Sequence, residues 1–190
     1  MKMEKLSNFV QTNKKSIHKL LNRMWYTVVY TRKQLLKTNY KVGKMECAKS
    51  GYTLIGEKWR RMWYPYPAFR WEYGEIGCTL DGLFVTFYLE GKTINEKFID
   101  VLIKNFGEQV VIYGGKEFLT DFWNPKRGIT PKAREILSNI EKSKEKIVQM
   151  DLTFEPWDDI VDRLASTLII SIDTVLKFAF NNKVKLIMLE

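Results

Sequence analysis

The chain has 190 residues, a net charge of +9, 45% hydrophobic residues and 14% aromatic residues. This length suits one domain, and the high hydrophobic content excludes an intrinsically disordered chain. Two cysteines, Cys47 and Cys78, are too few for a disulfide scaffold or a four-cysteine metal site, and we expect them to be buried as small apolar side chains.

The net charge lies entirely in the first fifty residues. They contain twelve lysine or arginine residues against two acids, a balance of +10, whereas the remaining residues balance at −1. Such a basic segment favours association with anionic partners without determining the fold. We therefore divide the chain into a basic amphipathic helical segment, residues 1–44, and an α+β domain, residues 45–190, that together form one folded unit.

Residues 4–39 are predicted to be helical, because apolar side chains recur there at three- and four-residue steps. Residues 40–90 change to short runs separated by glycine and proline, which predict consecutive strands. One of these runs, residues 83–90, has one strongly apolar face and a second face that is only half polar. Consecutive strands predict an antiparallel sheet.

The second half of the chain alternates helices and strands. Thr93 and Glu96 fit a capping box for a helix that ends at Gly107, and a short strand is expected at residues 109–113. A turn around residues 124–125 leads to the next helix.

Thr130 and Pro131 are predicted to begin that helix. Residues 147–154 then form a strand, Pro156 opens the most apolar helix, and residues 184–189 give a last strand-like tail. The expected fold class is α+β, with helices mainly on one face of an antiparallel sheet and a long basic N-terminal helix.

The longest apolar stretch, residues 164–180, is interrupted by Asp173 and Lys177, and a membrane span needs about twenty mostly apolar residues. Lys2 and Lys5 precede no apolar segment of the kind found in secretory signals. We therefore expect a cytoplasmic protein without a membrane partner.

Patterns typical of enzymes are absent from the sequence. The single histidine, His18, lies in a lysine-rich segment with no carboxylate close in sequence, which argues against acid–base catalysis. Phosphate-binding loops, nucleophile elbows and dinucleotide-binding motifs are also missing. We expect no cofactor and no catalytic residue.

The densest group of carboxylates precedes and opens the last helix. It consists of Asp151, Glu155, Asp158, Asp159 and Asp162. We favour a structural role, because acids in a first helical turn complement the helix macrodipole. Two alternatives are a site for a hard cation in a metal-assisted hydrolase and a docking place for the basic segment.

Residues 59–71 read W-R-R-M-W-Y-P-Y-P-A-F-R-W and contain six aromatic residues and three arginines. These residue types dominate protein interfaces, and they also stack on bases and pair with phosphates. A strand–turn–strand with its rings in the core is the structural alternative, and the prolines predict a turn or an edge strand. The candidate binding residues of this segment and of the basic helix are Trp59, Arg60, Arg61, Trp63, Tyr64, Tyr66, Arg70, Trp71, Lys14, Lys15, Lys19 and Arg23.

Three short stretches resemble an uncharacterised archaeal family of domains of unknown function. They are Y-P-Y-P-A-F at residues 64–69, E-I-G at residues 75–77 and V-I-Y-G-G-K-E-F-L-T-D-F-W-N-P at residues 111–125. The resemblance covers about residues 17–180 and implies an α+β fold similar to that of secretion chaperones. It supplies no catalytic residues, because its motifs are made of turn and packing positions.

Taken together, the residues and the resemblance favour a non-catalytic, chaperone-like binding module. Its partner would be a protein or an extended peptide, with a second copy of the chain as a variant. The alternative is a nucleic-acid-associated protein that uses the basic helix and the aromatic segment.

Overall fold

The computed structural model describes residues 14–48, 51–55, 58–62, 66–79, 82–114, 117–118, 133–154 and 161–188. Within these ranges, seven strands form an antiparallel sheet in the order β1-β4-β5-β6-β9-β7-β8. The strands are β1 (Val42–Ala48), β4 (Tyr66–Trp71), β5 (Gly74–Thr79), β6 (Gly82–Glu90), β9 (Ile147–Phe154), β7 (Val110–Gly114) and β8 (Glu117–Phe118). A separate hairpin, β2 (Gly51–Ile55) with β3 (Lys58–Met62), lies between β1 and β4 in the chain.

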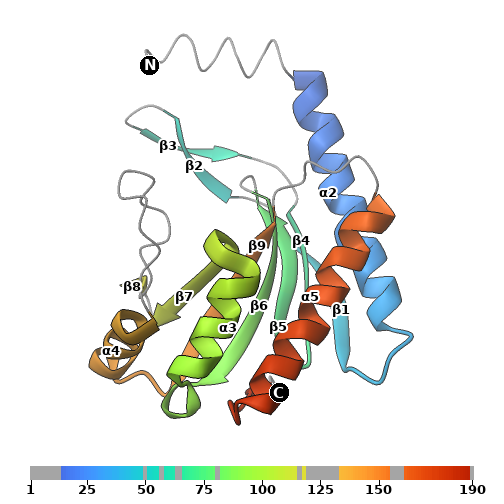
Figure 1. The fold of residues 1–190 in the computed structure, drawn as a ribbon. Helices are drawn as coiled ribbons and strands as arrows, with labels where there is room; N and C mark the ends of the chain where they lie inside the picture. Colours follow the sequence, from blue (N-terminus) through green and yellow to red (C-terminus); the bar gives the residue numbers. More distant parts are fainter. Residues whose placement is uncertain are drawn as a thin grey trace.

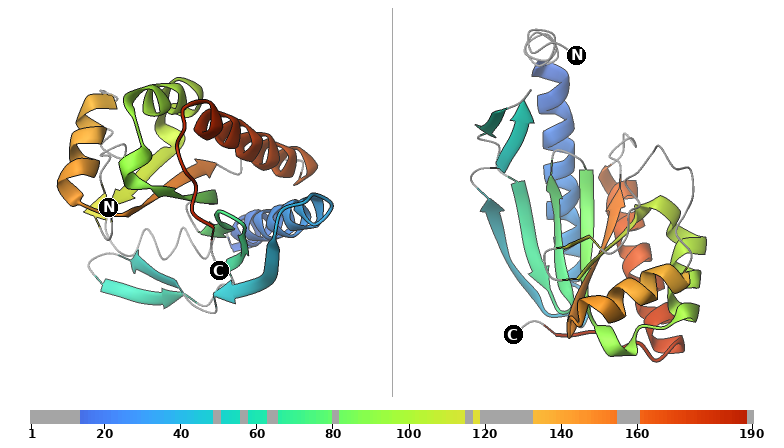
Figure 2. Two further views of the ribbon diagram at one scale, coloured as in Figure 1. Left: turned by 90° about the horizontal axis from the view of Figure 1, so that it is seen from below. Right: turned by 90° about the vertical axis from the view of Figure 1, so that its left-hand side faces the viewer.

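The four described helices lie on one side of this sheet (Figure 1). They are α2 (Lys14–Leu35), α3 (Glu96–Phe106), α4 (Ala133–Ser143) and α5 (Val161–Asn181), and short 3-10 turns, η1 (Gly91–Thr93) and η2 (Gly107–Gln109), flank α3. Both views of Figure 2 show the β2–β3 hairpin on the side away from α3, α4 and α5. The predicted α+β class, with an antiparallel sheet and helices gathered on one face, is confirmed.

The core lies between the sheet and the helices. Alternate side chains of β6 and β9 point into it and are buried: Leu83, Val85, Phe87, Leu89, Val148, Met150, Leu152 and Phe154. Cys78 of β5 is buried among them, and burial raises the pKa of its thiol to about 12, so that it stays protonated and unreactive.

The N-terminal helix α2 packs against α5 and against β4 and β5. Within the described residues it spans Lys14–Leu35, so it ends four residues earlier than predicted, where Thr38 donates its hydroxyl to the Leu35 carbonyl at 2.6 Å. The hydroxyls of its buried threonines are satisfied within the helix, because each donates to a carbonyl one turn back, Thr27 to Arg23 and Thr31 to Thr27.

The last helix, α5, is long and apolar enough to cross a membrane by length and composition alone. One stripe of it, however, is buried in the hydrophobic core: Leu164, Leu168, Ile172, Val175 and Ala179. The opposite stripe contains exposed Asp173 and Lys177. This division is typical of a helix that covers a sheet.

The cap of α3 differs from the predicted capping box. Asn95 is the N-cap, and its side-chain oxygen accepts from the Phe98 amide at 3.2 Å. Thr93 instead donates to the Glu90 carbonyl and accepts from the Lys185 amide. The helix ends at Gly107, as predicted, and Gly107 has a φ of +54° that favours glycine.

Pro67 lies inside β4, although the sequence predicted a turn or an edge strand for this stretch. The strand tolerates it because the last pair between β4 and β5 is Ala68↔Gly77. Pro67 pairs only with Cys47 of β1, so no ladder on its β5 side is interrupted.

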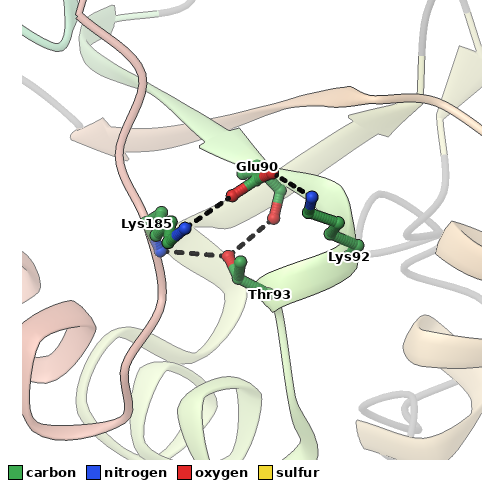
Figure 3. A network of polar contacts seen from close by, with 4 residues as sticks. All are labelled: Glu90, Lys92, Thr93 and Lys185. Carbon is green, nitrogen blue, oxygen red and sulfur yellow. Dashed lines mark hydrogen bonds and ion pairs between the residues drawn. The ribbon is translucent and has the colours of Figure 1, made fainter.

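The C-terminal tail runs beside the end of β6 rather than forming a full strand. Leu186 makes a single antiparallel bridge with Leu89. Figure 3 shows how the polar side chains at this place meet: Glu90 pairs with Lys92 at 2.8 Å and with Lys185 at 3.7 Å. The tail thus pairs with the end of β6, beyond the residues of β6 that pair with β5.

Candidate functional site

The predicted binding residues of the basic helix lie in the N-terminal half of α2, which extends beyond the end of the sheet (Figure 1). Lys14 and Lys15 are in its first turn, Lys19 is exposed, and Arg23 is half-buried.

The aromatic segment is divided between two separate sheets. Trp59, Arg60 and Arg61 lie on β3, opposite Leu54, Thr53 and Tyr52 of β2. Trp63 and Tyr64 fall outside the described residues, and Tyr66 begins β4 of the main sheet. The segment therefore belongs partly to the hairpin and partly to the main sheet.

Trp71 is a core residue, and its prediction as a binding residue is wrong. Its side chain is 2% exposed and packs edge-on against Tyr40, Tyr73 and Phe87, with ring centroids 5.5–5.7 Å apart. Its indole N–H donates to the Thr86 carbonyl at 3.4 Å. For this residue the structural alternative is correct, whereas its neighbour Arg70 is exposed.

The predicted group of carboxylates is split by the sheet. Asp162 is exposed in the first turn of α5, in the helical layer, whereas Asp151 is on β9 and alternates with the core residues Met150 and Leu152. The acids at positions 155, 158 and 159 lie outside the described residues. In the described part of the chain no three His, Cys, Asp or Glu residues are placed to hold a metal ion.

Asp151 belongs to a surface that we call the helix-free face. It is formed by the side chains of β4, β5, β6, β9 and β7 that point away from the four described helices, and strand pairing aligns them in rows. One row comprises Arg70, Glu75, Thr86, Asp151 and Val111, and the next comprises Tyr88, Gln149 and Tyr113.

Neutral hydrogen-bond donors from neighbouring positions hold the Asp151 carboxylate. Thr86 donates to Oδ1 at 2.7 Å, and the Gln149 amide donates to Oδ1 and Oδ2 at 3.1 and 3.2 Å. Burial raises the pKa of Asp151, while these hydrogen bonds act in the opposite direction. Among the described residues, no lysine or arginine forms an ion pair with it.

Other groups on the helix-free face are also perturbed. Burial raises the pKa of Glu75; Arg70 opposes this shift, and Glu46 and Asp151 add to it. Burial, and then the negative charge of Asp151, raise the pKa of Tyr113. Clusters of perturbed groups of this kind are concentrated at functional sites, so this face is the candidate site.

Replacing Asp151 with asparagine is expected to stabilise the protein at neutral pH by about 1 kcal/mol, the usual gain from a stabilising substitution. Because the folded-state pKa of Asp151 is raised, the cost of its charge to folding grows as the pH rises from the unfolded-state pKa and is complete above the folded-state pKa. Urea unfolding of both proteins between pH 3 and 8 measures the difference.

The gain from Asp151→Asn should vanish at the acidic end of this range, where the carboxyl is protonated in both states. Glu75, Tyr88 and Tyr113 face the same carboxyl, and Arg70 lies further along its row. Asp100→Asn, on the exposed side of α3, is the control and should show no such profile. A destabilised Asp151→Asn protein at pH 8 would contradict the expectation.

The sequence pointed to this face only weakly. Residues 83–90 show a second side that is half polar, which marks Thr86 and Tyr88 as non-core positions. The pairing of Thr86 with Asp151, 65 residues later, is visible only in the structure.

Comparisons with known proteins agree with this architecture. A solved structure of a conserved hypothetical protein from Pyrococcus furiosus matches with a TM-score of 0.69 and 24% identity, over 89% of this chain and 98% of that chain. This similarity shows the fold alone. No match was found among the curated proteins. Residues 19–166 match the model of a family described as "Protein of unknown function (DUF3201)". The resemblance to an archaeal family of unknown function is confirmed, and the chain belongs to the DUF3201 family.

Proposed function

We propose that the protein is a non-catalytic, chaperone-like binding module that holds an extended segment of a protein partner against the helix-free face. The observation that carries this proposal is the arrangement of half-buried polar and aromatic side chains, centred on Asp151, on the sheet face that carries none of the described helices. A face made only for solvent would have no use for a partly buried carboxylate that raises the cost of folding.

An extended peptide suits the geometry of this face. The side chains of one sheet face repeat about every 7 Å along a strand and about every 5 Å across strands. A peptide in extended conformation presents its own side chains with the same period of two residues. Tyr88, Gln149 and Asp151, which are half-buried in adjoining rows, can therefore contact alternate residues of such a partner, whereas Thr86 is buried and holds the Asp151 carboxylate.

The acids on the face favour a protein over a nucleic acid. Among the described residues of the face, Glu75 and Asp151 outnumber Arg70, so phosphate groups would be repelled there. A nucleic acid would have to use the N-terminal half of α2 or the β2–β3 hairpin instead, both of which extend beyond the same end of the sheet in Figure 1.

An immobilised array of random decapeptides tests the proposal, with the strongest binders titrated into the ¹⁵N-labelled full-length protein. Saturable chemical-shift changes are expected at Thr86, Tyr88, Gln149 and Asp151, and none on α3 or α4. Tyr88→Ser should weaken binding at least tenfold, as for a central interface residue, whereas the exposed Tyr26→Ser on α2 should not.

Two outcomes would reject the proposal: the absence of any saturable peptide, or shift changes confined to the helical side. In the second case the exposed apolar residues Tyr26, Val29 and Leu36 of α2 would become the binding surface, and a second copy of the chain would be the first partner to test.

A further inference from the structure

The helix-free face has a charge that the described residues leave uncompensated. In the row across β4, β5, β6 and β9, Glu75 stands directly opposite Arg70 and lies between Arg70 and Asp151. Three strand spacings separate Arg70 from Asp151, or about 14 Å. Arg70 is therefore matched by Glu75, and among the described residues Asp151 has only the neutral donors Thr86 and Gln149.

Two aromatic rings stand beside this carboxylate. Tyr88 and Tyr113 are the partners of Gln149 on its two sides, and Gln149 is two residues before Asp151 on β9. Both tyrosines are therefore diagonal neighbours of Asp151, a separation of about 7–8 Å. Both are half-buried on the same face.

A carboxylate with two aromatic rings in the neighbouring row has a composition that suits organic cations. The carboxylate supplies a charge-assisted hydrogen bond, and the negative faces of the rings attract an ammonium or guanidinium group and cover its alkyl chain. Thr86 and Gln149 fix the orientation of the carboxylate before any ligand arrives, which lowers the entropic cost of binding.

We propose that Asp151, together with its diagonal neighbours Tyr88 and Tyr113, is a recognition site for the cationic end of a lysine side chain of the protein partner. This inference rests on the proposed function, since it names the side chain by which the partner is recognised. A carboxylate that merely tied β6 to β9 would keep its role as an amide, whereas this site requires the charge.

The test uses a probe that needs no known partner. Nα-acetyl-lysine methylamide is titrated into the full-length protein, and the side-chain amide signal of Gln149 reports binding, because this amide contacts the carboxylate. We expect a saturable shift in the millimolar range. The Nε-acetylated probe, which has no charge, should bind at least tenfold more weakly.

Matched variants test whether the charged probe binds at Asp151. Asp151→Asn should weaken the charged probe at least tenfold and leave the neutral probe unchanged, whereas Asp100→Asn removes the same charge from α3 and should change neither. Tyr88→Leu should weaken the charged probe about two- to fivefold and Tyr88→Phe should not, because the ring is retained. Spermidine is titrated in parallel to separate a free polyamine from a protein side chain.

Equal affinity of the two probes, or equal effects of Asp151→Asn and Asp100→Asn, would overturn the inference even if peptides from the array bind. Spermidine binding as tight as that of the best lysine-containing decapeptide would overturn the assignment to a protein side chain. A lysine-selective site with no binder in the array would instead support this site and reject the extended-peptide function.

Discussion

Replacing Trp71 with alanine is expected to lower the free energy of unfolding by about 3–5 kcal/mol, the usual cost of removing a buried large aromatic side chain. Trp71 is 2% exposed and is the central ring of an edge-on cluster with Tyr40, Tyr73 and Phe87. Its loss leaves a cavity between β4 and the helices and removes the only described side-chain donor to the Thr86 carbonyl. Urea unfolding followed by circular dichroism measures the change.

Two variants accompany this measurement. Trp71→Phe keeps most of the apolar contact and should cost about 1–3 kcal/mol, so it remains measurable if the alanine variant does not fold. Phe180→Ala removes a ring that is 84% exposed and should change stability by less than about 0.5 kcal/mol. A loss below about 1 kcal/mol for Trp71→Ala would mean that Trp71 is not in the core.

Replacing Gly74 with alanine is expected to lower the free energy of unfolding by about 3 kcal/mol or more. This loss is at or above the upper end of the range for substitutions that overpack a core. A Cβ at position 74 would overlap the backbone carbonyl of Thr86 on β6, and its next neighbour, the amide nitrogen of Phe87, lies at 3.2 Å. Both are backbone atoms of a central strand, so relief requires β5 to move away from β6.

Gly43→Ala is the matched control, because its Cβ would lie 3.2 Å from a backbone oxygen, that of Arg70, but on the edge strand β1 beside a bulge. We expect a smaller loss there, since an edge strand can shift. Thermal unfolding of both variants, scored by the midpoint, gives the comparison. Equal decreases in the unfolding midpoint would show that the close contact between Gly74 and β6 is no more sensitive to an added Cβ than the edge strand is.

Much of the fold could be predicted because local sequence patterns indicate most of its helices and strands. Apolar periodicity located α5 and β9, and glycine located the end of α3. Element starts were less certain, because several side chains near α3 can cap it. Thr93 and Asn95 both suit an N-cap, and only the approach of the C-terminal tail, which takes the Thr93 hydroxyl, decides between them.

The candidate site was harder to predict, because it depends on strand register. Asp151 is close in sequence to the acids that open α5, and this proximity suggested a helix-start cluster. In the sheet its neighbours are instead Thr86 and Val111, which come from strands much earlier in the chain. Trp71 posed a similar problem, since burial is decided by alternation within β4, not by the aromatic content of the segment.

The packing of α2 against α5 has a consequence for synthesis on the ribosome. The apolar stripe of α2, with Met24 and Val28 at its centre, emerges first, and the helix that covers it emerges last among the described elements. Until then the nascent chain exposes the apolar stripe of α2, which favours aggregation. The docking of α5 on α2 then joins distant parts of the chain. Docking of α2 is therefore expected only after α5 has been synthesised, and folding is expected to depend on protection of α2 until then.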